Sequence, residues 1–536
     1  MKILMLYPKY PEATFWNANS AQWVFERRRA NLPPLGLITV ASYLPDDFEL
    51  RMVDRNIETE SEADWEWADV VFLSLMGIQK EDYRHCVAKA KERKVPIAIG
   101  GPFTHAFQEE SVADGDWVCV GEAEDIMEEF IADLRADRRG KRYDGGNKTN
   151  METVKTPRYD LLKNINDYGA MAVQFSRGCP FMCEFCDIIE IYGRVPRTKT
   201  PEQIIAELEE IKKFGYQGYI FLVDDNFIGN KKKAMVMLEE LAAWNNQQEF
   251  LYKYMTEASL NLADEPALLE KMALANMQMV FIGIETPDPK LLKSTKKLQN
   301  APGNHFEKFE RIREYGLHIT GGFIVGFDNE DRRIFEVQRD FIQEAGVGVA
   351  MMGLLLALPH TQLSRRLKKE GRLLEKFAPM EMTVDGINFI PKGEMTKRDY
   401  LTNYSKLIKA IYDPKPFFER IMPAVKKLNR KRQPTKFNLK VVARDLRIFL
   451  RHLYHFGLKE KGCRWYYWKG LATLLFKNPV AIEAFVFDCF FFYHLRRHGE
   501  YIQRNLAAYL NHPSPDDILD EVISVEKASV PQLVPA

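Results

Sequence analysis

The chain has 536 residues, more than one hydrophobic core serves well, so its length predicts several domains. The 46% apolar and 28% charged fractions exclude a disordered or collagen-like chain. The 75 basic residues balance the 75 acidic ones, which argues against a nucleic-acid partner. Seven cysteines, with no signal-like leader and no apolar run of spanning length, favour a reducing, cytoplasmic location over a disulfide framework.

The first predicted domain, residues 1–140, alternates short apolar runs with amphipathic ones. Strands are predicted at 3–7, 50–54, 68–76, 96–100 and 117–120, with helices at 35–44, 79–93 and 124–134. Apolar runs separated by helices are typical of a Rossmann-like parallel sheet covered on both faces, so ligands are expected at the carboxyl ends of its strands.

A polar linker is predicted over residues 141–165, followed by a second α/β domain over 166–390. Its strands are predicted at 172–175, 218–223, 251–256, 279–285, 319–325 and 349–356, each pair separated by a helical segment. Repeated strand–helix units predict a partial or full parallel barrel of (β/α)6 type. The alternation then stops, and residues 391–536 are predicted to form a helical C-terminal domain.

Three cysteines follow the first strand of the second domain. Cys179, Cys183 and Cys186 lie in the sequence FSRGCPFMCEFCDI, in a C-x3-C-x2-C spacing. Three thiolates in one short loop can hold three corners of a cubane iron–sulfur cluster and leave the fourth iron open. The alternative is a zinc site, which normally needs a closed fourth ligand.

The cysteine spacing, with the aromatic Phe185 before the last cysteine, resembles the radical S-adenosylmethionine (SAM) superfamily. The resemblance implies that Cys179, Cys183 and Cys186 bind a 4Fe–4S cluster. Its open iron would chelate the amino and carboxylate groups of SAM, and one electron would cleave SAM to a 5′-deoxyadenosyl radical.

Further SAM-binding residues are expected at the ends of the next strands. Asp225 and Asn226 lie where the family's element for the SAM amino group usually sits, although the usual Gly-Gly-Glu is absent. Glu257 and Glu285 end the following strands, and carboxylates there suit ribose hydroxyls. The alternative is that these residues cap helix N-termini.

An open sheet ahead of such a barrel resembles the cobalamin-binding class of the superfamily. The family's Asp-x-His corresponds to Asp54 and Asn56, its hydroxyl position to Ser74, and its paired glycines to Gly100 and Gly101. Since Asn56 replaces the histidine ligand, we expect cobalamin to bind without an imidazole on the metal. The alternative is a Rossmann-like domain for another nucleotide, or one that has lost its ligand.

The C-terminal domain contains a basic amphipathic segment near residues 439–453 and an aromatic segment from residue 481. Peripheral membrane contact through residues 436–495 has a physical basis, and the alternative is that both segments pack over the barrel. The roles of Cys463 and Cys489 are left open. The order of the three domains resembles the branch that contains hopanoid C-2 methylases.

The resemblance implies a cobalamin-dependent radical SAM enzyme that methylates an unactivated carbon of a lipid, an isoprenoid or another small hydrophobic substrate. One SAM would supply the methyl group by way of cobalamin, and a second would supply the radical. The alternative is radical oxidation or cyclisation without methyl transfer. An electron donor such as flavodoxin or ferredoxin is expected, and the substrate, the lower cobalt ligand and the oligomeric state are left open.

Overall fold

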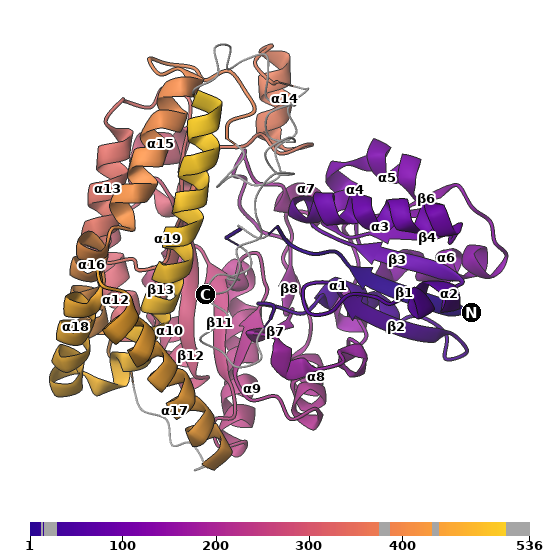
Figure 1. The fold of residues 1–536 in the computed structure, drawn as a ribbon, viewed down its shortest axis with the longest axis horizontal. Coiled ribbons are helices and arrows are strands. Elements are labelled where there is room, and N and C mark those ends of the chain that lie inside the picture. The colour runs from indigo at the N-terminus through magenta and orange to yellow at the C-terminus, as the bar shows by residue number, and fades with distance from the viewer. Residues whose placement is uncertain (12–13, 16–28, 375–385, 431–438, 511–536) are drawn as a thin grey trace.

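The computed structural model describes residues 1–11, 14–15, 29–374, 386–430 and 439–510. Two six-stranded parallel sheets and a set of C-terminal helices make up this part of the chain (Figure 1). The predicted fold class, an α/β sheet followed by a parallel barrel and a helical extension, is therefore confirmed.

The first sheet has the strand order β2-β1-β3-β4-β5-β6, and every pair is parallel. Its strands are β1 (Lys2–Tyr7), β2 (Glu49–Asp54), β3 (Val70–Ser74), β4 (Ile97–Gly100), β5 (Trp117–Val120) and β6 (Lys141–Asp144). Its helices are α1 (Leu35–Ala41), α2 (Glu62–Trp67), α3 (Lys80–Arg93), α4 (Pro102–Ala106), α5 (Gln108–Asp114) and α6 (Met127–Arg135).

Helices cover both faces of this sheet, as the apolar runs predict. Ile3 and Met5 of β1 pack with residues of α1 and α6 on one face. Leu4 and Leu6 pack with residues of α2, α3 and α4 on the other. The two cores arise because successive side chains of a strand point to opposite faces.

The edge strand β6 lies in the range predicted as a linker. Only Tyr143 of its four residues is buried, and its hydroxyl donates to Asp133 Oδ2 at 2.8 Å. A short, charged edge strand gives no apolar run for a sequence pattern to detect. The remainder of 141–165 contains only short turns of 3-10 helix.

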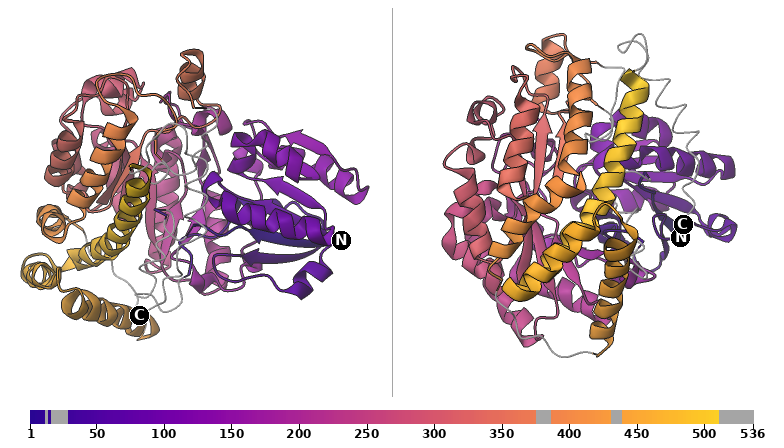
Figure 2. Two further views of the ribbon diagram at one scale, coloured as in Figure 1. Left: turned by 45° about the horizontal axis from the view of Figure 1, so that its top comes forward. Right: turned by 60° about the vertical axis from the view of Figure 1, so that its left-hand side comes forward.

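The second sheet has the order β14-β13-β12-β11-β10-β7, again fully parallel. It curves around a concave side, and its helices lie mainly on the convex side (Figure 2). The strands are β7 (Ala170–Val173), β10 (Tyr219–Leu222), β11 (Lys253–Ala258), β12 (Met277–Glu285), β13 (His318–Val325) and β14 (Ala350–Leu354).

The first long barrel helix shows why these segments are helical. Thr200 caps its N-terminus with a capping box to Gln203, and Pro201 occupies the first turn. The helices of this region are α7 (Ile188–Ile191), α8 (Pro201–Lys213), α9 (Lys231–Gln247), α10 (Pro266–Leu274), α11 (Pro289–Ser294), α12 (His305–Glu314), α13 (Ile334–Ala345) and α14 (Gln362–Lys369).

The C-terminal helices share a continuous core with the barrel rather than forming a separate one. They are α15 (Lys397–Ile411), α16 (Pro414–Lys427), α17 (Leu439–Tyr454), α18 (Arg464–Lys477) and α19 (Ile482–Leu510), and α19 crosses the concave side of the second sheet (Figures 1 and 2). Cys463 and Cys489 are buried free thiols. None of the helices in the described ranges has the length and apolar character needed to cross a bilayer.

Candidate cofactor sites and the central cavity

The cysteine loop runs from a two-residue strand, β8 (Ser176–Arg177), to α7. Gly178 has a φ of +91°, and a Cβ there would lie 2.9 Å from the Gly193 carbonyl oxygen, so only glycine fits this turn. The Cys179 N–H donates to the same oxygen at 3.3 Å. This turn brings the first cysteine to the carboxyl end of the second sheet.

The thiols lie in a largely buried loop, and side-chain amides point toward two of them. Burial raises the pKa of Cys179, and burial with the other thiols and Asp187 raises that of Cys186 well above its ordinary value. Side-chain amides of Asn226 and Gln299 donate toward Cys179 Sγ at 3.9 Å and Cys183 Sγ at 3.7 Å. Buried sulfurs with aimed donors fit an iron–sulfur cluster, because hydrogen bonds to sulfur stabilise the cluster's negative charge.

A site for a single metal ion is a different arrangement. Within the described ranges, no group of three or more His, Cys, Asp or Glu side chains could hold one ion. In a cubane cluster, by contrast, each cysteine binds a different iron.

Three carboxyls lie near the cysteine loop, Asp224 buried and Asp225 and Glu257 partly buried. Burial, with repulsion from neighbouring carboxylates, raises the pKa of Asp224 and Asp225 to about 7 and that of Glu257 to about 8. The Gly178 N–H donates to Asp225 Oδ2 at 3.3 Å. A cationic ligand would relieve this repulsion, and SAM carries both a sulfonium and an ammonium group.

Asn226 is held in place by the next strand. Its Oδ1 accepts from the Ser259 N–H at 3.3 Å, and its Nδ2 lies 3.3 Å from Ser259 Oγ. The side chain therefore links the ends of β10 and β11 while pointing its amide toward Cys179. Within the described structure neither Asp225 nor Asn226 caps a helix through its side chain, so the capping alternative is not supported for them.

Glu285 differs from the sequence expectation because it already has a partner. Its carboxylate forms a buried ion pair with Lys297, and its backbone adopts a φ of +66° at an irregularity at the end of β12. Lys297 Nζ also lies 5.9 Å from the Phe185 ring centroid. No local motif marks Lys297, which the sequence analysis missed, since only the fold brings it to Glu285.

A cavity of about 1410 Å³ extends along the concave side of the second sheet. Cys186, Glu257 and Glu285 line it near the carboxyl ends of the strands, and Tyr219 and Lys253 line it near the opposite ends. Most of the wall is apolar, including Phe281, Phe323, Met351, Ile448, Phe487 and Phe490. The cavity thus joins the cysteine loop to α17 and α19.

The loops at the carboxyl end of the first sheet are shaped by backbone and by paired side chains. Asn56 Nδ2 donates to Asp54 Oδ1 at 2.8 Å, and its Oδ1 accepts from the Tyr10 N–H at 2.9 Å. Asp54 is buried, which raises its pKa to about 6, and Tyr168 donates to it at 3.1 Å. The Asn56 side chain is thus hydrogen-bonded to Asp54 and to the backbone of Tyr10.

The two glycines after β4 are not equivalent. Gly101 has a φ of +88°, and a Cβ there would lie 2.8 Å from Ser74 Oγ and 2.9 Å from the Leu75 backbone. A Cβ at Gly100 would meet only Cys119 Cβ, at 3.9 Å. This cradle of partly exposed Ser74, Gly100 and Gly101 fits the close approach of a nucleotide tail.

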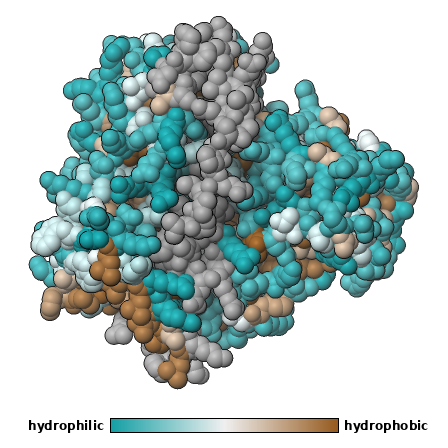
Figure 3. All heavy atoms as spheres, viewed as in Figure 1, coloured by the Kyte–Doolittle hydropathy of each residue, from teal (hydrophilic) through white to brown (hydrophobic). Residues whose placement is uncertain are grey.

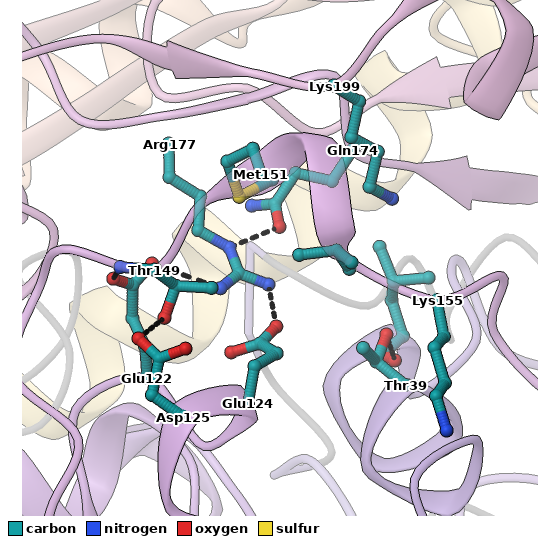
Figure 4. A network of polar contacts seen from close by, with 12 residues as sticks. Thr39, Glu122, Glu124, Asp125, Thr149, Met151, Lys155, Gln174, Arg177 and Lys199 are labelled. Carbon is teal, nitrogen blue, oxygen red and sulfur yellow. Dashed lines mark hydrogen bonds and ion pairs between the residues drawn. The ribbon is translucent and has the colours of Figure 1, made fainter.

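Buried ion pairs join the two cofactor regions (Figure 4). Arg177 precedes Cys179 by two residues, and Glu122 and Glu124 lie just after β5. Arg177 Nη1 lies 3.0 Å from Glu122 Oε1, and Arg177 Nη2 lies 2.6 Å from Glu124 Oε1. Arg197 lies 2.8 Å from the same Glu122. These contacts fix the cysteine loop to the first sheet, and the sequence analysis missed them because their partners lie far apart in the chain.

Comparisons with known proteins agree with this geometry. The B12 binding domain model matches residues 23–131, the radical SAM superfamily model 173–341, and a domain of unknown function (DUF4070) 361–508. An uncharacterized methyltransferase of Synechocystis sp. is 35% identical over 531 residues, 98% of this chain and 97% of that protein. The hopanoid C-2 methylase of Rhodopseudomonas palustris is 37% identical over 377 residues, 70% of this chain and 71% of that protein.

Solved structures show the same fold at low identity. The cobalamin-dependent SAM radical enzyme OxsB superimposes with a TM-score of 0.58 at 16% identity, covering 98% of this chain and 84% of that one. The radical SAM methyltransferase TsrM of Kitasatospora setae gives 0.57 at 14% identity, covering 69% and 78%. The chain belongs to the cobalamin-dependent radical SAM methylase family, whose cofactors are a [4Fe–4S] cluster, SAM and cobalamin.

Proposed function

We propose that this enzyme methylates an unactivated carbon of a lipid or isoprenoid held in the central cavity. The apolar wall of that cavity, which extends from Cys186 to α17 and α19, carries the proposal. Along β11 alone, the distance from Lys253 to Glu257 is about 13 Å at the usual rise of a strand. An elongated apolar molecule would fit with one end near the cluster, and hopanoids are the substrates named for two of the relatives.

The residues of the cysteine loop would bind the cluster and SAM. Cys179, Cys183 and Cys186 would each supply a thiolate, and Phe185 would pack beside them. Asp225 and Asn226 would face the SAM amino group, and Glu257 and Glu285 its ribose. When bound, the cluster and SAM supply a radical that removes a substrate hydrogen, and cobalamin supplies the methyl group.

The loops at the carboxyl end of the first sheet would hold cobalamin. Ser74, Gly100 and Gly101 would lie against its nucleotide tail, and Asp54 would hold Asn56 in the loop. The apolar wall would exclude water from the reacting carbon, which protects a radical from side reactions.

The cysteine loop also has an exposed point for an electron donor. Met182 lies between Cys179 and Cys183 and is 37% exposed. The exposed Arg194 donates to the neighbouring Pro180 carbonyl at 3.3 Å. A small acidic electron carrier such as flavodoxin or ferredoxin would be attracted to this basic edge.

The products of SAM test the proposal. Reconstituted enzyme is supplied with reductant, cobalamin and a lipid extract, and S-adenosylhomocysteine and 5′-deoxyadenosine are measured. We expect both products, in matched amounts and together with a methylated lipid, and both should fall without cobalamin. Deoxyadenosine without S-adenosylhomocysteine would instead support the alternative of oxidation or cyclisation.

A further inference from the structure

The outward face of α17 is apolar and exposed. Leu439, Val442, Leu446, Leu450 and Tyr454 are between 46% and 73% exposed. Their spacing of three or four residues places them in one line along the helix. In a water-soluble helix such a line normally faces a core, so its exposure calls for a partner.

The apolar surface continues beyond α17. Leu458 in the connection and Trp465, Trp468, Leu475 and Phe476 of α18 are between 45% and 90% exposed. Figure 3 shows the brown surface along α17, reaching toward α18 at the lower left. We call the ten exposed apolar residues of α17, the connection and α18 the apolar stripe.

Positive charge accompanies the apolar stripe. Residues 439–477 contain nine Lys or Arg and only two acidic residues. Of these, Arg447, Arg451, Lys461, Arg464 and Lys469 have exposed side chains. Basic side chains beside exposed Leu and Trp are typical of helices that lie in the interface of an anionic bilayer.

The inner face of α17 forms part of the cavity wall. Ile448, Phe449 and His452 line the cavity, and Val442 belongs both to that lining and to the apolar stripe. The rim of the cavity and the outer surface therefore meet on this helix. Arg444 Nη1 donates to the Gln217 carbonyl at 2.9 Å, which holds α17 against the barrel at this rim.

We propose that the apolar stripe docks the enzyme on an anionic bilayer and that its lipid substrate reaches the cavity from the bilayer past α17. The docking step stands without the proposed methylation, whereas the passage of substrate rests on it. The bilayer is favoured over a protein partner because the charge of the surface is almost entirely of one sign, which complements anionic headgroups.

Co-sedimentation with vesicles tests the docking. Leu446→Glu/Leu450→Glu should weaken binding of the full chain to phosphatidylcholine–phosphatidylglycerol vesicles by at least about tenfold. The matched control is Val236→Glu/Val337→Glu, which places the same charges on exposed apolar positions of α9 and α13 and should bind normally. Equal binding by both double variants would overturn the proposal.

Tryptophan quenching tests which residues enter the bilayer. Brominated phosphatidylcholine mixed with phosphatidylglycerol should quench part of the fluorescence of the wild-type chain. The Trp465→Phe/Trp468→Phe variant should lack the quenchable part of the fluorescence, while its affinity for vesicles should stay within about threefold of the wild-type affinity. If quenching is unchanged in this variant, α18 does not enter the membrane. If the Leu446→Glu/Leu450→Glu exchange alters only the oligomeric state, the stripe is an interface between copies of the chain, and the proposal fails.

The passage of substrate is tested by comparing presentations of one lipid extract. The Leu446→Glu/Leu450→Glu variant should methylate lipid in vesicles at least about tenfold more slowly than the wild type does. It should methylate detergent-dispersed lipid at the wild-type rate. Equal loss in both forms would contradict passage from the bilayer. Absence of methylation by the wild type in either form would count against the proposed function, while the sedimentation result would still decide the docking.

Discussion

The carboxyl ends of the two parallel sheets are built differently. At the first sheet, Asn56 is engaged by Asp54 and Tyr10, and Gly101 packs closely against the Leu75 backbone. At the second, Asp225 and Glu257 are partly buried, and burial with repulsion by Asp225 raises the pKa of Glu257. The first arrangement suits a large cofactor that lies on backbone, and the second suits a small cationic one. Two parallel sheets with different strand orders would thus serve two kinds of ligand through their loops.

The largest effect is expected at the second sheet from Cys186→Ala. Loss of a direct ligand should reduce SAM cleavage by more than about 100-fold, since losing an outer-shell partner alone costs 10–100-fold. Iron content and the brown absorption of the cluster report the cause. The control variant Cys119→Ala, in β5 of the first sheet, should retain the iron content and the brown absorption. A normal iron content in the Cys186→Ala variant would show that Cys186 is not a ligand of the cluster.

Lys297→Met should destabilise the barrel by about 3–5 kcal/mol, because it leaves the buried Glu285 carboxylate without its cation. The double change Lys297→Met/Glu285→Gln removes both charges and should recover most of that loss. Urea unfolding followed by circular dichroism measures both. If the single and double variants are equally unstable, the pair does not matter for stability.

Gly101→Ala should cost about 1–3 kcal/mol locally, because it places a Cβ against Leu75 at a φ that side chains rarely adopt. Cobalamin affinity, followed by its visible spectrum, should fall by at least about tenfold. The matched control is Gly140→Ala, directly before β6, which has a φ of +73° and whose Cβ would meet no atom within 4 Å. If the two variants bind cobalamin with equal affinity, the turn at Gly101 does not contribute to cobalamin binding.

The smallest expected effect is on pH dependence. The pKa of Glu257 is raised to about 8, so the carboxyl is protonated at pH values below this and ionises as the pH rises. A cation is bound better by the ionised form, so SAM affinity should increase up to pH 8, by at most about tenfold per pH unit for one proton released. Calorimetric titration of Glu257→Gln should show a shallower dependence. If the pH dependence of SAM affinity is unchanged by this substitution, the proton released on SAM binding comes from another group.

Apart from β6, the sequence predicted the strands of both six-stranded sheets to within a few residues, because buried parallel strands are continuous apolar runs. The sequence also predicted that the three cysteines follow the end of a strand, because the motif and the apolar run before it lie within one short segment. Lys297 and Arg177 could not be found, because their partners Glu285 and Glu122 are set only by the fold. Strand β6 was missed because an edge strand needs few apolar residues.

Apolar periodicity likewise could not distinguish α17 from α19. In α19, Phe485, Asp488 and Phe492 are buried, so the packing alternative holds for that helix. In α17, Leu446 and Leu450 are exposed at similar helical spacing. The pattern indicates which face is apolar, and only tertiary structure shows whether protein covers it.

The ion pairs of Arg177 with Glu122 and Glu124 connect the cysteine loop to the loop after β5, so we expect the two cofactors to depend thermodynamically on each other. Ordering the cysteine loop around the cluster holds Arg177 in place, and Arg177 in turn holds the loop after β5, next to the cobalamin cradle. Reciprocity then requires that the factor by which the cluster tightens cobalamin equals the factor by which cobalamin stabilises the cluster. Cobalamin titrations of cluster-free and cluster-loaded enzyme measure this coupling, which Arg177→Gln should abolish. The enzyme would thereby favour the fully loaded form over either half-loaded one.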